Sequence, residues 1–136
     1  MIDLLLIEDQ PLTRLGVRAV LEQHDDIKLA DEADNAADGF AKFRALKPDV
    51  TILGLRLPDS CSLDNLDNYF AEDSKAKIIV LAEHAGDAEI AAALKKGAAG
   101  FICKDEEPEE MDKAIQTVAA GRKIIKTEKT QELKEN

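Results

Sequence analysis

The chain has 136 residues, of which 45% are hydrophobic and 34% are charged, a balance typical of one globular domain. Its formal net charge of −10 argues against direct binding of a nucleic-acid backbone, which needs clustered Lys and Arg. Because no apolar run is long enough to span a membrane and the first residues do not resemble a signal peptide, we expect no membrane contact. Cys61 and Cys103 are interpreted as reduced thiols of a cytoplasmic protein.

The hydrophobic pattern predicts strands that alternate with helices. The predicted strands are short apolar runs at Ile2 to Ile7, Ile27 to Glu32, Val50 to Leu53, Lys77 to Ala82 and Ala99 to Cys103. The predicted helices are Pro11 to about Gln23, Asn35 (as N-cap) to Ala45, Leu63 to Phe70, Asp87 to Lys96 and Glu107 to about Gly121, with Leu55 to Ser62 as a loop. This order predicts an α/β fold, a five-stranded parallel sheet wound on both faces by helices in a flavodoxin-like way.

The domain is expected to span residues 1–121, and residues 122–136 are expected to form a linker or tail. The stretch from Thr127 to Asn136 is polar and charged, with Leu133 as its single apolar residue. Such a segment cannot bury enough apolar surface to order itself.

Chemically active side chains follow several of the predicted strands. Glu8 and Asp9 follow the first strand, Gly54 ends the third, Ala82 ends the fourth and Lys104 follows the fifth. The carboxyl ends of these strands meet at one edge of a parallel sheet, which is where such folds bind ligands. Adjacent carboxylates with a lysine across the cleft form the outline of a site for magnesium and a phosphoryl group.

At these positions the sequence resembles the receiver domains of response regulators, and it is most similar to receivers of the LuxR/NarL class of DNA-binding regulators. The resemblance is carried by Leu6-Ile7-Glu8-Asp9-Gln10-Pro11, Lys47-Pro48-Asp49-Val50, Leu55-Arg56-Leu57-Pro58 and Gly97-Ala98-Ala99-Gly100-Phe101-Ile102-Cys103-Lys104-Asp105. It covers Met1 to about Gly121. It implies a CheY-like fold and a role in two-component or phosphorelay signal transduction.

The family also implies a chemistry. An aspartate at the end of the third strand accepts a phosphoryl group, and an acidic pair, matched here by Glu8 and Asp9, holds magnesium. A hydroxyl on the fourth strand and a lysine, matched by Lys104, bind the phosphoryl group. An aromatic residue on the fifth strand, matched by Phe101, turns inward on activation.

The sequence departs from the family at the two central positions. Gly54 stands where the family has the nucleophilic aspartate, and Ala82 stands where it has the hydroxyl. Covalent catalysis needs a nucleophilic side chain. We therefore predict a degenerate receiver, or pseudo-receiver, with no catalytic residue, no enzyme activity and no cofactor. Glu8 and Asp9 are expected to hold magnesium weakly or not at all, and instead to cap the helix at Pro11 or to pair with Lys104.

Other reactive side chains are interpreted as having no role in this chemistry. Asp59 lies in the predicted loop and is not expected to replace the missing phosphoacceptor, and Arg56 is not a nucleophile. His24 and His84 have no acid and nucleophile at a recognisable spacing and are expected at the surface. Cys61 has no neighbouring base or cation in the sequence and is expected to be an unreactive thiol.

The leading functional hypothesis is the regulatory part of a transcription regulator that acts through self- or partner association, independently of aspartyl phosphorylation. The resemblance implies a homodimer, paired through the first and last helices or through the fourth helix, fifth strand and last helix. It implies a histidine kinase or another regulator as partner, and DNA binding only through a further domain beyond Asn136.

Two alternatives remain open. The space left by Gly54 and Ala82 could hold a small molecule or anion near Lys104, or the chain is a conventional phosphoreceiver if Gly54 is an artefact. An enzyme of flavodoxin-like fold is disfavoured, because no Gly-rich phosphate loop follows the first strand.

Overall fold

The computed structural model describes residues 1–84 and 86–126 of the chain. In chain order its elements are β1 (Ile2–Ile7), α1 (Pro11–Leu21), β2 (Ile27–Ala33), α2 (Ala36–Leu46), β3 (Val50–Gly54), β4 (Arg56–Leu57), β5 (Ser60–Cys61), the 3₁₀ turn η1 (Ser62–Asp64), α3 (Leu66–Glu72), β6 (Ile78–Ala82), α4 (Asp87–Lys95), β7 (Gly100–Cys103), α5 (Pro108–Ala119) and β8 (Ile124–Lys126). The main sheet is parallel, with the strand order β2-β1-β3-β6-β7-β8.

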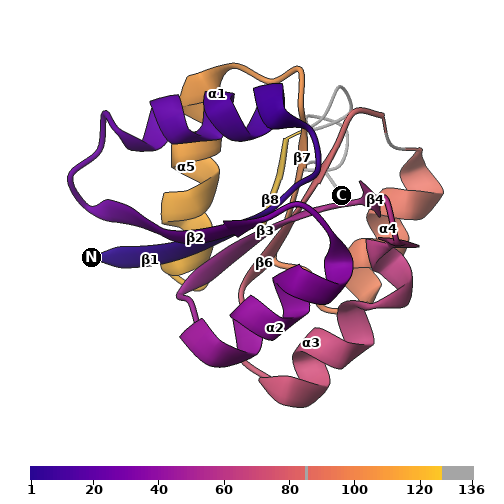
Figure 1. The fold of residues 1–136 in the computed structure, drawn as a ribbon. Coiled ribbons are helices and arrows are strands. Elements are labelled where there is room, and N and C mark those ends of the chain that lie inside the picture. The colour runs from indigo at the N-terminus through magenta and orange to yellow at the C-terminus, as the bar shows by residue number, and fades with distance from the viewer. Residues whose placement is uncertain (85, 127–136) are drawn as a thin grey trace.

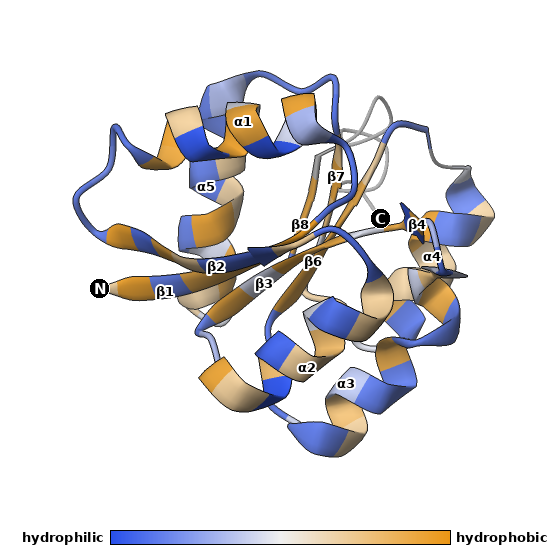
Figure 2. Cartoon of the chain, viewed as in Figure 1, coloured by the Kyte–Doolittle hydropathy of each residue, from blue (hydrophilic) through white to orange (hydrophobic). Residues whose placement is uncertain are grey.

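Helices cover both faces of this sheet. Figure 1 shows α1 and α5 together on one side, and α2 and α3 on the other. The buried side chains form two matching clusters, one that includes α1 and α5 and one that includes α2, α3 and α4. Figure 2 shows β1, β3 and β6 as mostly hydrophobic strands between helices of mixed character, as expected for a sheet buried on both faces. The predicted α/β architecture is therefore confirmed.

The sheet has six strands rather than the five predicted. β8 follows α5 and pairs in parallel with β7, beyond Gly121, where the domain was expected to end. Ile124 packs against the α1–α5 cluster and Ile125 against the other, so successive side chains reach opposite faces. Only two apolar residues mark this strand in the sequence, too few to show a period. The predicted tail from Thr127 to Asn136 lies outside the described residues.

The segment after β3, predicted as a loop, contains a small antiparallel hairpin. β4 pairs with β5. The η1 turn follows, so α3 begins at Leu66, three residues after its predicted start at Leu63. The hairpin is tied to α2, because the carboxylate of Asp59 accepts hydrogen bonds from the backbone N–H groups of Ala36 and Ala37, at 2.7 and 3.0 Å. These bonds hold the pKa of Asp59 below its usual value. Asp59 is thus a helix-capping residue, consistent with its exclusion as a phosphoacceptor.

Local signals set the helix boundaries. The Asn35 side chain accepts a hydrogen bond from the Asp38 N–H at 2.8 Å, which confirms it as the N-cap of α2. Gly97 has φ +110° just after α4, which confirms it as the stop of that helix. α1 ends at Leu21, two residues before the predicted Gln23. Among the described residues, no helix is long and apolar enough to cross a membrane.

Candidate functional site

The strand register brings the predicted site positions to one edge of the sheet. Ile7 of β1 pairs with Leu53 of β3, and Gly54 pairs with Leu81 of β6. Ala82 of β6 in turn pairs with Cys103 of β7. The residues that follow these strands therefore gather around one cleft of about 620 Å³, whose walls include the side chains of Asp9, Glu83, Ala82 and Lys104.

Glu8 is fully buried, does not line this cleft, and pairs with Lys104. The Lys104 ammonium donates a hydrogen bond to Oε2 of Glu8 at 2.5 Å, so the predicted pairing is confirmed, with Glu8 rather than Asp9 as the acid. The Glu8 side chain is 0% exposed and the Lys104 side chain 16% exposed. A carboxylate that is fully removed from water needs such a counter-charge, because an unpaired buried charge is strongly unfavourable.

The other oxygen of Glu8 occupies space that a side chain at residue 54 would need. A Cβ placed on Gly54 would lie 2.6 Å from Oε1 of Glu8, which is closer than real Cβ contacts. Oε1 has no hydrogen-bond partner among the described residues. Glu8 can therefore point this way because residue 54 has no side chain.

Gln10, which is not among the site residues predicted from the sequence, extends this pair into a network across three loops. Its Oε1 accepts a hydrogen bond from Lys104 at 2.7 Å, and its Nε2 donates to Glu83 at 2.7 Å. The bond from Gln10 and the charge of Lys104 lower the pKa of Glu83. Gln10 follows β1, Glu83 follows β6 and Lys104 follows β7, so the network holds these strand ends together. In the sequence, the only sign of this role is that Gln10 directly follows the acidic pair Glu8-Asp9.

The expectation that Glu8 and Asp9 cap α1 is wrong. The N-cap of α1 is Gln10, which makes no side-chain capping bond, and the first turn of α1 carries no acid. The chain before α1 is held instead by Arg14, whose guanidinium donates to the backbone carbonyls of Glu8 and Asp9, at 2.8 and 3.1 Å.

The side chains at this edge do not form a set of magnesium ligands. Glu8 is committed to Lys104, Gly54 has no side-chain oxygen, and Asp9 alone of the predicted acids lines the cleft. Among the described residues, no group of three His, Cys, Asp or Glu side chains is arranged to hold a metal ion. Magnesium is usually held by one or two carboxylates together with phosphate oxygens and water. Asp9, as the one carboxylate of the predicted acidic pair that faces the cleft, is a poor site for an ion that loses water reluctantly.

The remaining predicted residues have clear places. Phe101 is fully buried, in the hydrophobic cluster that includes α4 residues. Arg56 forms an ion pair with Glu89 of α4 and so ties the hairpin to that helix. His84 lies at the surface on the rim of the cleft. His24 was also expected at the surface, and it is half-buried just after α1, with its Nδ1 3.6 Å from Oδ1 of Asp112 on α5.

Comparison with known proteins places this geometry in a family. A model of the response regulator receiver domain matches residues 4–116. The nitrate/nitrite response regulator protein NarL of Escherichia coli K12 is 34% identical over 122 residues, which are 90% of this chain and 56% of that protein. The transcriptional regulatory protein MctR of Rhizobium johnstonii is 34% identical over 120 residues, 88% of this chain and 56% of that protein. The chain thus spans just over half the length of these relatives.

Solved structures agree. A two-component response regulator of the LuxR family from Aurantimonas superposes with a TM-score of 0.91 at 27% identity, covering 99% of this chain and 96% of that one. The signal receiver domain of the response regulator NarL from Mycobacterium tuberculosis gives a TM-score of 0.84 at 29% identity, covering 89% and 98%. The chain therefore belongs to the response regulator receiver domain family and is a receiver domain of the NarL/LuxR class.

Proposed function

We propose that this receiver works without aspartyl phosphorylation. The observation that carries the proposal is the position of Glu8, whose carboxylate fills the space of a side chain at Gly54 while it binds Lys104. In the family, that space belongs to the aspartate that accepts the phosphoryl group. Here it holds an acid that is buried, already paired and shielded from the cleft.

Exposure of the chain to acetyl phosphate and magnesium tests this proposal. We expect no phosphoryl adduct by intact mass spectrometry, because Gly54 has no nucleophile and Ala82 has no hydroxyl to contact a phosphoryl oxygen. A receiver that retains the third-strand aspartate, treated in parallel, is the positive control. An adduct mapped to any aspartate of the cleft would restore the conventional phosphoreceiver as the leading interpretation.

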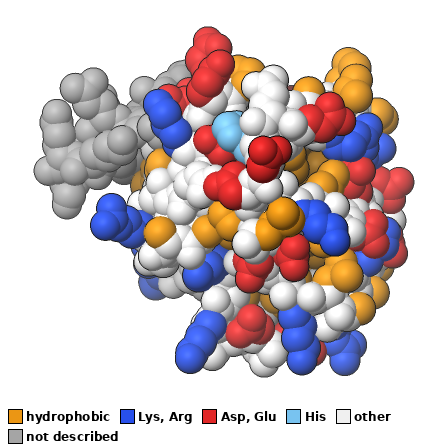
Figure 3. Space-filling model, turned by 90° about the vertical axis from the view of Figure 1, so that its left-hand side faces the viewer, with side chains coloured by type: hydrophobic (Ala, Val, Ile, Leu, Met, Phe, Trp, Pro, Cys, Tyr) orange, Lys and Arg blue, Asp and Glu red, His pale blue; other side chains and the backbone are white. Residues whose placement is uncertain are grey.

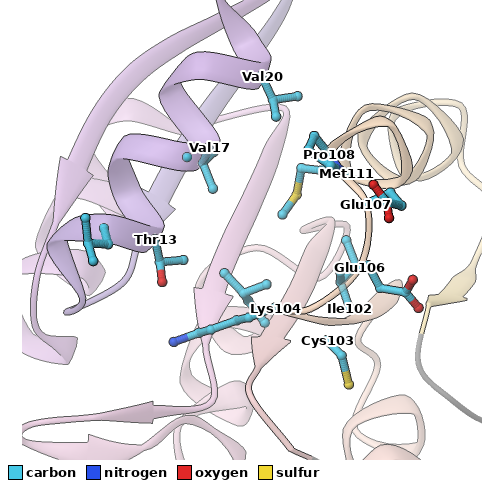
Figure 4. A pocket seen from close by; sticks show the side chains of 13 residues that line it. Thr13, Val17, Val20, Ile102, Cys103, Lys104, Glu106, Glu107, Pro108 and Met111 are labelled. Atoms are coloured by element: carbon cyan, nitrogen blue, oxygen red, sulfur yellow. The ribbon is translucent and has the colours of Figure 1, made fainter.

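We further propose that the receiver signals through association of two copies at α1 and α5. Leu12 and Leu15 of α1 are 82% and 55% exposed and lie one helical turn apart, so they form a neighbouring pair of large aliphatic side chains at the surface. Leu12 also lines a groove of about 300 Å³, and Figure 4 shows Val17 and Val20 facing Met111 across it. Among the described residues, α4 carries no exposed large hydrophobic side chain, which favours this surface over the α4 surface.

Replacing Leu12 with glutamate should shift the chain toward monomer. A charge at this position has to be desolvated in a two-fold apolar contact, so we expect dimer affinity to fall at least tenfold, measured by analytical ultracentrifugation. Leu46→Glu is the matched control, since Leu46 is exposed at the end of α2, on the other face of the sheet. A wild-type chain that stays monomeric at high concentration, or equal effects of the two variants, would contradict this dimer.

The third part of the proposal is a role in transcription regulation. The relative DevR/DosR of Mycobacterium tuberculosis is a DNA-binding transcriptional activator, 26% identical over 125 residues that make up 58% of that protein. We propose the same role for the protein that carries this receiver, with DNA contacts made outside the present chain. The face shown in Figure 3 supports this division, because acidic and basic side chains lie side by side there without a continuous basic stripe.

A ligand-sensing cleft is a weaker candidate. The cleft is large enough for a small molecule, but the Lys104 ammonium is bound by both Glu8 and Gln10. An anion would have to displace both partners before it could pair with this lysine. The acids Asp9, Glu83 and Glu89 on the cleft walls also oppose a negative ligand.

A further inference from the structure

A glycine in the middle of α1 has no role in packing or backbone geometry among the described residues. Gly16 is the sixth of the eleven residues of α1, where glycine is less favourable than alanine. Its φ is not positive, and a Cβ placed on it would meet no described atom within 4 Å. The other glycine within a helix, Gly39 of α2, differs, because a Cβ there would lie 2.6 Å from the side chain of Ile7. The fold itself would therefore accept alanine at residue 16.

Gly16 belongs to an exposed face of α1 that has no polar side chain. Leu12, Leu15, Gly16 and Ala19 follow the spacing i, i+3, i+4 and i+7, which places them on one side of a helix, and all four are exposed. The solvent side of a surface helix normally carries charged and polar residues. Gly16 also lines the groove between α1 and α5. The glycine is thus the lowest point of an apolar surface, where another backbone could approach α1 closely.

The distribution of charge favours a second copy as the partner of this face. The chain has a net charge of −10, so two copies repel each other over most of their surface. α1 contains no acidic residue, whereas each of the other α-helices contains at least one. Its two basic side chains are already bound within the chain, since Arg14 and Arg18 lie 3.7 and 2.6 Å from Glu32. Two α1 helices can therefore meet without bringing acids together.

We propose that the outer faces of α1 in two copies pack against each other and that the two helices cross at Gly16. This inference rests on the dimer proposed above and names its central contact. In a two-fold interface, a residue on the axis meets its own counterpart in the other copy. Packed helix axes lie about 8–10 Å apart, depending on the side chains at the crossing. A glycine there permits the closest approach, so Leu12 and Leu15 of both copies pack on either side of it.

Gly16→Ala should have opposite effects on folding and on association. In a Leu12→Glu background, which keeps the chains monomeric, it should raise the midpoint of thermal unfolding by about 2–6 °C, because alanine suits a helix interior. In the otherwise unchanged chain it should weaken the dimer about tenfold in analytical ultracentrifugation, because a methyl group overpacks a close crossing. Gly86→Ala is the matched control, since Gly86 also has open space around its Cβ position but lies at the N-cap of α4. Its dimer affinity should not change.

Cross-linking shows which residues meet across the two-fold axis. A disulfide needs Cα atoms about 4.4–6.8 Å apart. Gly16→Cys, made in a Cys61→Ser chain, should therefore form a covalent dimer under mild oxidation, with the link mapped to residue 16 of both copies. The remaining Cys103 is buried. Glu109→Cys in the same background, exposed on α5, should form much less covalent dimer.

The results distinguish this contact from the dimer itself. A wild-type chain that stays monomeric would contradict both. A dimer that Leu12→Glu dissociates but Gly16→Ala leaves unchanged would keep the dimer and overturn the crossing at Gly16. More efficient cross-linking of Glu109→Cys than of Gly16→Cys would likewise overturn it and place α5 at the two-fold axis instead.

Discussion

Lys104→Met is expected to destabilise the fold by about 3–5 kcal/mol, the usual cost of removing one partner of a buried ion pair. The variant leaves the Glu8 carboxylate 0% exposed, with no counter-charge and with Oε1 already lacking a hydrogen-bond donor. It also removes the donor to Gln10, which otherwise links the ends of β1 and β7. The free energy of unfolding, measured with urea, gives the test.

A double-mutant cycle shows whether the loss comes from the pair itself. Glu8→Gln removes the charge while it keeps the shape, so Glu8→Gln/Lys104→Met should be clearly more stable than the sum of the two single losses predicts. Lys113→Met is the matched control, because Lys113 is exposed on α5 and forms an ion pair with Glu110 of the same helix at 3.6 Å. We expect its effect to stay within about 0.5 kcal/mol. If Lys104→Met were as stable as Lys113→Met, the buried Glu8 carboxylate would not need Lys104 as a counter-charge.

The sequence was sufficient to predict the alternating strands and helices of this fold and the residues that follow the strands. Apolar runs located five of the six strands of the main sheet, and parallel topology then placed the ends of β1, β3, β6 and β7 at one edge. The approach of Lys104 to an acid followed from that placement and from the cost of an unpaired ammonium. The choice of Glu8 over Asp9 could not be predicted in this way, because it depends on the side-chain conformation that the space at Gly54 permits.

Contacts between residues far apart in the chain could not be predicted from the sequence, for a different reason. Asp59 caps α2 from 22 and 23 residues away, and Gln10 meets Glu83 across 73 residues. Neither contact leaves a periodic signal, since each involves one polar residue in a connection between elements. The β4–β5 hairpin and β8 were missed because two or three residues cannot display the alternation that identifies a longer strand.

Gly54→Asp is expected to make the stability of the chain depend on magnesium. The new Cβ would lie 2.6 Å from Oε1 of Glu8, 3.2 Å from a methyl carbon of Leu57 and 3.3 Å from the backbone oxygen of Ile7. Glu8 has to move, and two carboxylates then compete for the single Lys104. Without a divalent ion we expect a loss of about 1–3 kcal/mol from overpacking, increased by the repulsion of like charges. Magnesium, which prefers paired carboxylates, should recover part of that loss.

Glu8→Asp together with Gly54→Asp completes the argument, because the shorter acid withdraws from the space that Asp at residue 54 needs. This double variant should be more stable than Gly54→Asp in the absence of magnesium and should gain more from its addition, measured as the midpoint of thermal unfolding. Gly54→Asn is the control for shape, and its midpoint should not change with magnesium.

With acetyl phosphate, intact mass should reveal an adduct on the variants with Asp at residue 54 only. Ala82 still offers no hydroxyl to such an adduct, so the amide signals of α4 should stay in place after phosphorylation. If the unfolding midpoint of Gly54→Asp were as insensitive to magnesium as that of Gly54→Asn, the proposed competition between Glu8 and a side chain at residue 54 would be wrong.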